Sequence, residues 1–378
     1  MDYLKISADD HIDLAYLPHD IWTERVPKAL RAAAPHIEHT DKGQFWMCED
    51  KMWSEYRTAE WFARPGRNPL ALDRGGVGEE GRPVNTAKRL EDMARDGVEA
   101  TVMFPPIVSL NPSDPALRDA IVAGYNDWAA DFGDSAPGQF FPVALLSPAD
   151  PKAATAEMLR IAKDGRLKQV NFLVNDVTTE MHFADWDVFW DNAAETGMLV
   201  SYHAGGSIQT NTMRDMQTRM VNTDKRAPVF GMGLGDGGRA WFDPFVNLFT
   251  FGTLERRPTL RFIFAESDMG WMPYVVEQMD LRYNRLFETI KESDVSLKIK
   301  PSEVFKQQVY VTYQTDAVGL HLLDFFGEGH VMWASDYPHH DSTWPFSQDF
   351  VDRETAHLTS DRTRAVVRDN AAALYGVG

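Results

Sequence analysis

A short apolar run near the C-terminus ends on an acidic residue in a way that restricts the fold. Val331 to Ala334 is followed closely by Asp336, and Pro338 then stops the run. Three earlier apolar runs also end on titratable or metal-binding side chains, namely Asp9 with His11, His203, and Glu266. Buried strands that deliver such groups at their C-terminal ends are typical of a (β/α)8 barrel. The pattern therefore predicts one functional edge to which several strands contribute.

Strand-like runs recur along the whole chain. The eight expected strands are 5–8, 100–104, 140–146, 169–174, 199–203, 261–265, 309–313 and 331–334. Helical patterns lie between most of them, as in 88–97, in a helix from Asp114-Pro115 to Trp128, and in 184–196. Alternating strands and helices indicate a parallel sheet, and eight such units predict closure into an α/β TIM barrel.

Two long segments interrupt this alternation. Residues 36–84 follow the first strand and contain Trp46, Trp53, Trp61 and a Gly/Pro-rich run. The alternatives are a solvated surface excursion and a lid over the metal side, and a long loop in a compact domain favours the lid. The second segment, 205–238, contains a G-x-G-x-x-G match at 233–238, which does not directly follow a strand and so does not predict a dinucleotide site. We expect residues 1–378 to form a single barrel domain with an insertion at about 36–84.

Composition excludes several kinds of partner. The net charge of −18 disfavours nucleic acid and anionic membranes, and 44% hydrophobic residues suffice for a sizeable core. The single Cys48 excludes an intrachain disulfide and fits a reducing compartment. No apolar stretch approaches about 18 residues, and the N-terminus lacks the pattern of a signal peptide. The expectation is a cytoplasmic protein that acts on a small molecule, without a membrane or nucleic-acid partner.

The strand ends supply a candidate ligand set for one divalent ion. Asp9 and His11 are two residues apart at a strand end and project to the same side. With His203 and Asp336 they offer imidazole nitrogens and carboxylate oxygens, a donor set that suits Zn or Mn. A lone histidine at a strand end more often caps a turn, but four such positions in chain order favour a metal site.

These features together resemble the amidohydrolase superfamily, in the amidohydrolase-related branch that includes aminocarboxymuconate-semialdehyde decarboxylase and the resorcylate-type decarboxylases. The matching elements are Asp9-x-His11, His203, Ser335-Asp336-Tyr337-Pro338-His339 and the terminal Asn-Ala-Ala-Ala-Leu-Tyr-Gly at 370–376. They span nearly the whole chain. The resemblance implies one divalent metal ion at the mouth of a TIM barrel, with Asp336 as both ligand and proton carrier.

The chain departs from that family pattern at two strand ends. Asp9 stands where many amidohydrolases have the first histidine of His-x-His, a replacement that is familiar in this branch. Glu266 stands where the characterised decarboxylases carry a histidine. An ionised Glu266 beside Asp9 and Asp336 would repel a substrate carboxylate unless it is protonated or paired with an arginine. The alternative is that Glu266 caps the helix that follows from about Met272.

Four further residues are weaker candidates. His339 either orients the substrate and supports Asp336 or packs a loop. Trp271 and Trp344 are candidates for a substrate wall, although aromatic residues at such spacing usually belong to the core. Arg239, like Arg214 and Arg219, is a candidate to bind an anionic group.

The sequence offers no competing nucleophile, since Cys48 lacks a matched histidine and no G-x-S-x-G motif or P-loop occurs. These residues therefore favour catalysis by a bound metal ion. The first expectation is a hydrolase of a small cyclic or aromatic compound, in which Asp336 accepts a proton from metal-activated water and later passes it to the leaving group. Glu266 would then be either an acid next to the metal ligands or a further ligand. The alternative is a non-oxidative decarboxylase of a carboxylated aromatic or muconate-like substrate. A metal-free binding protein is a third, disfavoured class. The branch is often dimeric, and the Trp-rich insertion is a candidate interface.

Overall fold

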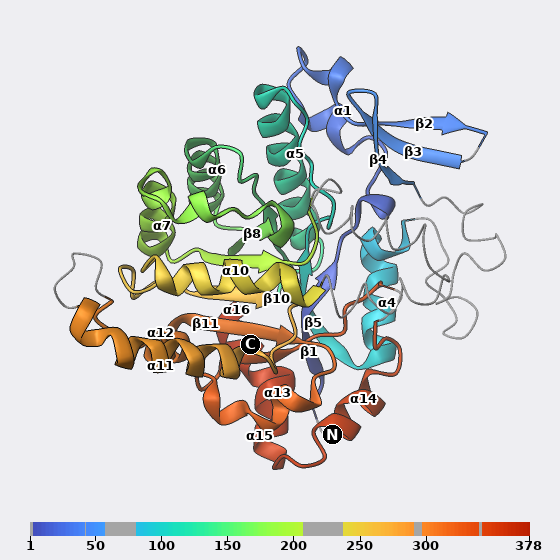
Figure 1. The fold of residues 1–378 in the computed structure, drawn as a ribbon. Coiled ribbons are helices and arrows are strands. Elements are labelled where there is room, and N and C mark those ends of the chain that lie inside the picture. Colours follow the sequence, from blue (N-terminus) through green and yellow to red (C-terminus); the bar gives the residue numbers. More distant parts are fainter. Residues whose placement is uncertain (1–2, 42, 57–80, 207–236, 291–296, 340–341) are drawn as a thin grey trace, which may run out of the picture.

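Parallel strands form the centre of the molecule, and helices cover them (Figure 1). The computed structural model describes residues 3–41, 43–56, 81–206, 237–290, 297–339 and 342–378. The parallel strands are β1 (Lys5–His11), β5 (Val98–Phe104), β6 (Phe140–Pro142), β7 (Ala144–Leu145), β8 (Gln169–Leu173), β9 (Leu199–His203), β10 (Phe262–Ala265), β11 (Val309–Tyr313) and β12 (Val331–Trp333). They form two sheets, with the orders β1-β5-β6 and β12-β11-β10-β9-β8-β7.

Backbone hydrogen bonds connect the two sheets on one side, and the chain itself connects them on the other. On one side, Asp336 N donates to Asp9 O (3.0 Å) and His11 N donates to Tyr337 O (2.7 Å), which ties the end of β12 to β1. On the other side, the predicted strand 140–146 is split at Val143, so that β6 pairs with β5 and β7 pairs with β8. An alternating α/β fold of parallel strands in this order is consistent with a TIM barrel.

Helices follow the strands as the alternation predicts. The longer ones are α4 (Thr86–Asp96), α5 (Pro115–Asp134), α6 (Pro151–Asp164), α7 (Ala184–Thr196), α10 (Gly237–Thr250), α11 (Met272–Ile290), α12 (Pro301–Gln308) and α14 (Ser347–Glu354). The shorter ones are α1 (Ile21–Arg25), α13 (Ala317–His321), α15 (Ser360–Arg364) and α16 (Asn370–Tyr375). The predicted Asp114 cap is confirmed, because its side chain accepts from Ala116 N (2.9 Å), and α5 continues beyond Trp128 to Asp134. None of the described helices is both long and apolar enough to cross a membrane.

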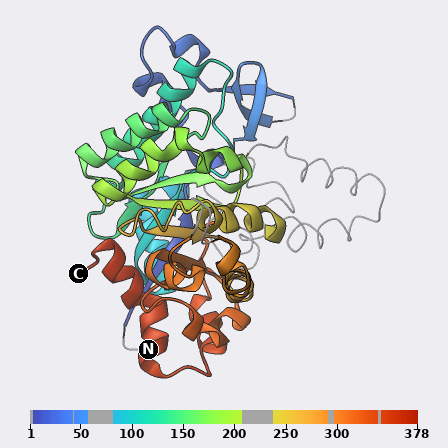
Figure 2. The same ribbon diagram turned by 60° about the vertical axis from the view of Figure 1, so that its left-hand side comes forward.

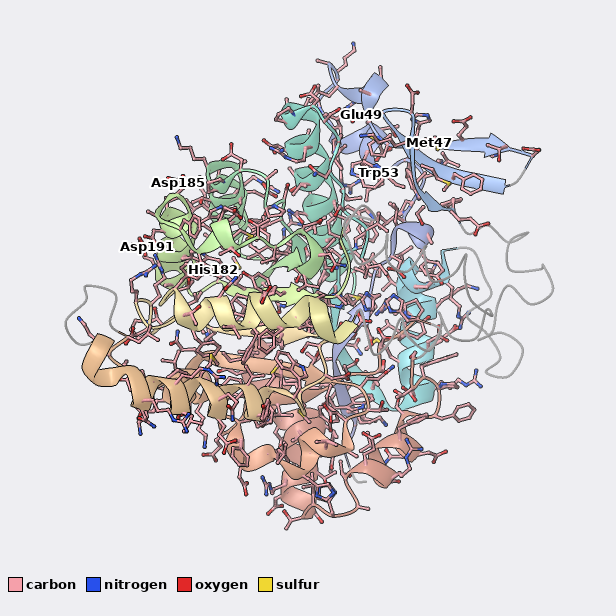
Figure 3. All side chains as sticks on the ribbon, in the orientation of Figure 1. Met47, Glu49, Trp53, His182, Asp185 and Asp191 are labelled. Atoms are coloured by element: carbon pink, nitrogen blue, oxygen red, sulfur yellow. The ribbon has the colours of Figure 1, made fainter. Side chains whose placement is uncertain are left out.

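The segment after β1 contains a small antiparallel sheet that the sequence did not predict. Its strands are β2 (His36–Thr40), β3 (Gly43–Cys48) and β4 (Lys51–Glu55), paired in that order. Glu49 and Asp50 turn the chain between β3 and β4 with φ of 49° and 59°, and neither residue is the glycine that usually marks such a turn. Glu49, Met47 and Trp53 lie on this sheet beside the start of α5 (Figure 3), where Glu49 accepts from Ser113 N (2.7 Å).

The rest of the expected insertion, 57–80, lies outside the described residues. Its role as a lid stays a prediction. The sheet itself is held to the first strand's loop by Trp46, whose indole N–H donates to Leu14 O (2.7 Å) and whose ring meets that of Trp22 edge-on. The view in Figure 2, turned from that of Figure 1, shows β2–β4 projecting from the body of the molecule.

Candidate metal centre

The four predicted ligands meet at the C-terminal ends of the strands. His11 Nε2 lies 3.0 Å from Asp336 Oδ1 and 3.7 Å from Asp9 Oδ1. His203 Nε2 lies 3.2 Å from the same Asp9 oxygen and 3.4 Å from Glu266 Oε2. Two overlapping groups of donor atoms, one with Asp9, His11 and His203 and one that includes Glu266 and Asp336, each lie within 4.8 Å. The structure therefore gathers Asp9, His11, His203, Asp336 and Glu266 into one cluster.

The donor atoms of this cluster fit a divalent cation. Both ring nitrogens of His11 and Oδ1 of Asp336 are buried and lack a well-aligned hydrogen bond, although His11 Nε2 and Asp336 Oδ1 lie close together. Buried polar atoms are normally hydrogen-bonded, so nitrogen and oxygen atoms that face one another without a well-aligned hydrogen bond suit a bound cation. Neighbouring groups orient the other donors, since His203 Nδ1 lies 2.8 Å from Ala204 O and Thr312 donates to Asp9 Oδ2 (3.0 Å).

The backbone at two strand tips adopts a conformation that is uncommon for residues other than glycine. Glu266 follows β10 with φ of 53°, and Asp336 lies just beyond β12 with φ of 61°. Left-handed backbone at such residues costs about 1–3 kcal/mol and is concentrated at functional sites. The turn at each tip directs a carboxylate into the cluster, which explains why neither strand simply continues.

Burial and mutual charge shift the pKa values of the cluster. Desolvation within the cluster raises the pKa of Glu266 to about 8, although 37% of its side chain is exposed, and the nearby Asp336 carboxylate adds to the rise. Burial alone would lower the pKa of His203, but Asp9 outweighs it and raises that pKa to about 9. Burial would likewise raise the pKa of Asp336, yet His339 and His11 hold it below its ordinary value. Such perturbed groups in one cluster are typical of catalytic sites.

His339 contacts the cluster directly. Its Nδ1 lies 2.9 Å from Asp336 Oδ1, and its ring stacks on that of His11 with centroids 3.8 Å apart. Its Nε2 lies 3.1 Å from Asp13 Oδ2. Burial opposes protonation of His339, but Asp336 and Asp13 outweigh it and raise the pKa well above its usual value. Sequence reasoning missed Asp13, whose only signal was its place two residues after His11.

A buried ion pair beneath the cluster was also missed. Arg89, on α4, is fully buried and donates through Nη2 to Asp10 Oδ2 (3.2 Å) and through Nη1 to His11 O (3.0 Å). The Asp10 carboxylate also accepts from the hydroxyl groups of Ser335 and Thr101. Asp10 and Arg89 therefore fix the backbone of β1 and of the β12 end from which the ligands project.

The structure packs both predicted substrate-wall residues against other parts of the protein. Trp344 is 2% exposed and its indole N–H donates to Asp92 O (2.9 Å), so it presents no open face to a substrate. Trp271 is half-buried and packs on Phe245, with ring centroids 5.1 Å apart, at the edge of the hydrophobic core. Contact of either tryptophan with substrate stays a prediction.

The predicted anion-binding arginines are not tested by the structure. Arg239 lies in α10, but its side chain lies outside the described residues, as do Arg214 and Arg219 altogether. Their binding of an anionic group therefore stays a prediction.

Comparisons with known proteins agree with this geometry. The chain is similar over its full length to an amidohydrolase from Mycobacterium avium subsp. paratuberculosis K-10, with 18% identity, 100% of each chain covered and a TM-score of 0.74. It is also similar to 5-carboxyvanillate decarboxylase from Sphingomonas paucimobilis, with 19% identity, 100% of each chain covered and a TM-score of 0.64.

A third similar structure contains a metal ion. It is 5-carboxyvanillate decarboxylase from Novosphingobium aromaticivorans DSM 12444, complexed with manganese and 4-hydroxy-3-methoxy-5-nitrobenzoic acid, with 17% identity, 99% and 96% of the chains covered and a TM-score of 0.65. At these identities the likeness concerns the fold. No curated protein sequence matches the chain. The sequence model of the family described as amidohydrolase matches residues 43–377, so this chain belongs to the amidohydrolase family.

Proposed function

We propose that this protein is a metal-dependent decarboxylase that releases CO2 from a carboxylated aromatic or muconate-like compound. The observation that carries the proposal is the convergence of Asp9, His11, His203 and Asp336 at the strand ends, where their nitrogen and oxygen donor atoms form two overlapping groups that each lie within 4.8 Å. Hydrolysis is the first expectation from the sequence, but two of the similar structures described above are named as decarboxylases. Their names support the lyase reaction over hydrolysis.

The residues present would hold one divalent ion, Zn or Mn, through Asp9, His11, His203 and Asp336. When bound, such an ion supplies a Lewis acid that orients and polarises the substrate. Zn binds imidazole nitrogen well and Mn binds carboxylate oxygen well, so the mixed donor set accommodates either metal.

Decarboxylation needs a proton at the carbon that loses CO2, and Asp336 is placed to supply it. The electron pair of the broken C–C bond stays on the ring carbon, which takes a proton from Asp336 after the imidazolium of His339 has protonated that carboxylate, because the low pKa of Asp336 leaves it ionised at rest. His339 Nδ1 lies 2.9 Å from Asp336 Oδ1 and can return a proton to that oxygen. Asp13, 3.1 Å from His339 Nε2, holds the imidazole in the orientation that this transfer requires.

Hydrolysis remains the second candidate because of Glu266. Its carboxyl group lies 3.4 Å from His203 Nε2, within the cluster, where a second acid or base would assist the attack of water. Glu266→His separates the two candidates, since a decarboxylase should tolerate the imidazole, whereas a hydrolase that uses Glu266 should lose turnover.

The reaction itself is tested by measuring CO2 release from a panel of carboxylated phenols, beside lactones and amides, with Mn or Zn supplied. Asp336→Asn is the control that keeps the shape of the side chain but cannot deliver the proton. Release of CO2 by the parent and its loss in Asp336→Asn would support the proposal. Hydrolysis of a lactone or amide with no CO2 from any phenol would contradict it.

We also propose how the barrel closes, where the protein is located and how many copies assemble. We interpret the two sheets as one closed (β/α)8 barrel in a single domain, with residues 36–84 as an insertion over its mouth. A cytoplasmic location and a homodimer are further expectations, which fractionation of cells and light scattering of the purified protein would test.

A further inference from the structure

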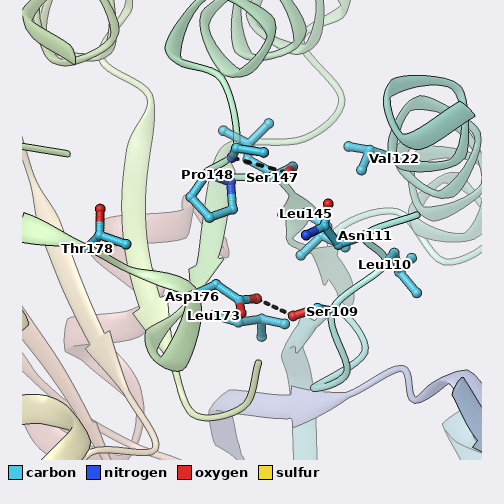
Figure 4. Close-up of a pocket in the computed structure, with 12 residues that line it drawn as sticks. Ser109, Leu110, Asn111, Val122, Leu145, Ser147, Pro148, Leu173, Asp176 and Thr178 are labelled. Atoms are coloured by element: carbon cyan, nitrogen blue, oxygen red, sulfur yellow. Dashed lines mark hydrogen bonds between the residues drawn. The ribbon is translucent and has the colours of Figure 1, made fainter. Parts of the chain in front are cut away.

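A pocket of about 240 Å³ lies between α5 and α6, the helices that follow β5 and β7 (Figure 1). The pocket drawn in Figure 4 adjoins it, since both are lined by Val122, Leu146 and Ser147. None of the described residues that line the α5–α6 pocket belongs to the metal cluster. Whatever binds between these helices therefore has no contact with the predicted metal ligands through the pocket walls.

The pocket exists because the two helices are bridged at one place and lined by short side chains at another. Asn126 Nδ2 donates to Glu157 Oε1 (2.7 Å), and Arg160 Nη1 donates to Asp127 Oδ1 (2.6 Å), which fixes the spacing of α5 and α6. Nearer the start of α6, three of the lining residues are alanines, namely Ala153, Ala154 and Ala156. Methyl groups are too short to fill the space between helices that longer side chains hold apart.

Arg118 reaches this pocket from α5 with most of its hydrogen-bonding capacity unused. Only 10% of its side chain is exposed, and its Nε donates to Asp119 Oδ1 (3.1 Å). Its terminal nitrogens, Nη1 and Nη2, have no hydrogen bond with any described residue. A guanidinium group carries five N–H donors, and buried donors are normally hydrogen-bonded. Arg118 therefore offers its two terminal nitrogens to a ligand in the pocket.

The other ionisable residues that line the pocket are already paired. Both carboxylate oxygens of Glu157 accept from Arg160, Oε2 from Nε and Oε1 from Nη2, each at 2.8 Å. With Arg118 and Asp119, the lining holds two arginines and two carboxylates and is formally neutral. A ligand with one negative charge would complete the pairing of Arg118. A dianion would in addition be repelled by the carboxylates of Asp119 and Glu157.

Shape and size restrict the ligand further. The two oxygens of a carboxylate accept two parallel N–H bonds from the planar fork of an arginine. Beside the fork, the lining is aliphatic and consists of Val122, Leu146 and the α6 alanines. An apolar cavity of roughly 150 Å³ binds benzene, so a pocket of about 240 Å³ accommodates an aliphatic body of about six carbon atoms with its carboxylate.

We propose that the α5–α6 pocket binds a small aliphatic monocarboxylate. Its oxygens accept hydrogen bonds from Nη1 and Nη2 of Arg118, and its body packs on Val122 and the α6 alanines. Binding requires neither the metal ion nor a particular reaction at the metal centre, so this proposal does not depend on the proposed function.

The test is a titration of the full-length protein with hexanoate, 1-hexanol and inorganic phosphate at neutral pH in the presence of EDTA, followed by ligand-observed NMR. Hexanoate should bind saturably. Both 1-hexanol, which lacks the charge, and phosphate, which lacks the apolar body, should bind more weakly. Arg118→Met should weaken hexanoate at least about tenfold, the effect of losing one charge-assisted hydrogen bond, and should leave 1-hexanol nearly unchanged. Ala153→Phe should fill the pocket and weaken both.

The matched control is Arg353→Met on α14. Arg353 also pairs with the next residue in the chain, through Nη2 and Glu354 Oε1 (3.6 Å), but its side chain is 63% exposed and lies outside the pocket. This variant should bind hexanoate as the parent does. Circular dichroism checks that each variant folds, and either pocket variant alone decides the question.

Three results would overturn the proposal. The first is parent-like hexanoate binding by a folded Arg118→Met or Ala153→Phe variant, which would place the ligand elsewhere, for example at the metal centre. The second is a parent that shows no saturable binding. The third is phosphate that binds as tightly as hexanoate, because the aliphatic lining would then contribute nothing.

Discussion

At the scale of single residues, Asp13 is the contact on which the orientation of His339 depends. Asp13→Asn should lower kcat about 10- to 100-fold, the usual effect of removing a group that orients a catalytic or metal-binding side chain. KM, metal content and the thermal unfolding temperature should change little, because His339 touches Asp336 at 2.9 Å and its loss of orientation affects proton transfer. Steady-state kinetics beside metal analysis make the measurement. Asp13→Asn with parent-like kcat would show that His339 needs no such partner.

Asp96 is a residue whose charge weakens the fold at neutral pH. It is 5% exposed, and burial raises its pKa to about 6 from an ordinary value of 3.8. Because the pKa of Asp96 is higher in the folded than in the unfolded state, its neutral carboxyl group contributes to the free energy of unfolding. This contribution is fully present below about pH 4 and is lost as the pH rises through 6. Asp96→Asn cannot ionise, so its stability relative to the parent should improve by up to about 3 kcal/mol between pH 4 and pH 7.

Urea unfolding of both proteins at several pH values measures this difference. Asn also weakens the contacts of Asp96 with Ser347, so the variant is compared with the parent across pH rather than at one pH. A stability difference that stays constant from pH 4 to pH 7 would contradict the shifted pKa.

At the scale of elements, the contact between α4 and β1 depends on one buried ion pair. Arg89→Met removes the partner of Asp10 and should destabilise the protein by about 3–5 kcal/mol, because a buried carboxylate is left uncompensated. Arg95→Met, on an exposed position of the same helix, is the matched control and should cost about 1 kcal/mol or less. Chemical denaturation measures both. Equal losses would mean that the buried pair contributes no more than a surface contact.

The connection after β9 requires glycine for two separate reasons. Gly205 has φ of +112°, and a Cβ there would lie 2.3 Å from the oxygen of Ile107. Gly205→Ala should cost roughly 2–5 kcal/mol, the sum of about 1–3 for overpacking and about 1–2 for the backbone conformation. Gly165→Ala has a similar φ of +80° with nothing within 4 Å, so it isolates the backbone part and should cost only about 1–2 kcal/mol. If both variants lose the same stability, the close approach to Ile107 is unimportant.

Element prediction succeeded where the pattern is local and failed where a strand changes partner. Strands 199–203 and 309–313 and helix 184–196 match the structure, since apolar runs and flanking glycines decide them. The predicted strand 140–146 is two strands, because Pro142 has no N–H to donate and the chain passes from one sheet to the other.

At the scale of the whole molecule, the metal ion should link binding to stability. Added Mn or Zn should raise the unfolding temperature of the parent, because an ion that binds only the folded state stabilises it by about 2.7 kcal/mol at 100 times its Kd. His11→Ala should lose this increase, whereas His321→Ala, at an exposed position on α13, should keep it. Differential scanning fluorimetry with and without chelator checks the prediction. If neither Mn nor Zn changes the unfolding temperature of the parent, the proposed metal site is contradicted.

The sequence by itself determined most of the parallel strands, several helices and the chemical types of the groups at the strand ends, because periodicity and chain breaks are local properties. Only the tertiary structure decided which of those groups meet. It brought Asp13 to His339, Arg89 to Asp10 and Glu266 to His203, and it buried Trp344. These contacts join residues far apart in the chain, and both their distances and the pKa shifts that follow depend on how the elements pack and how much water they exclude.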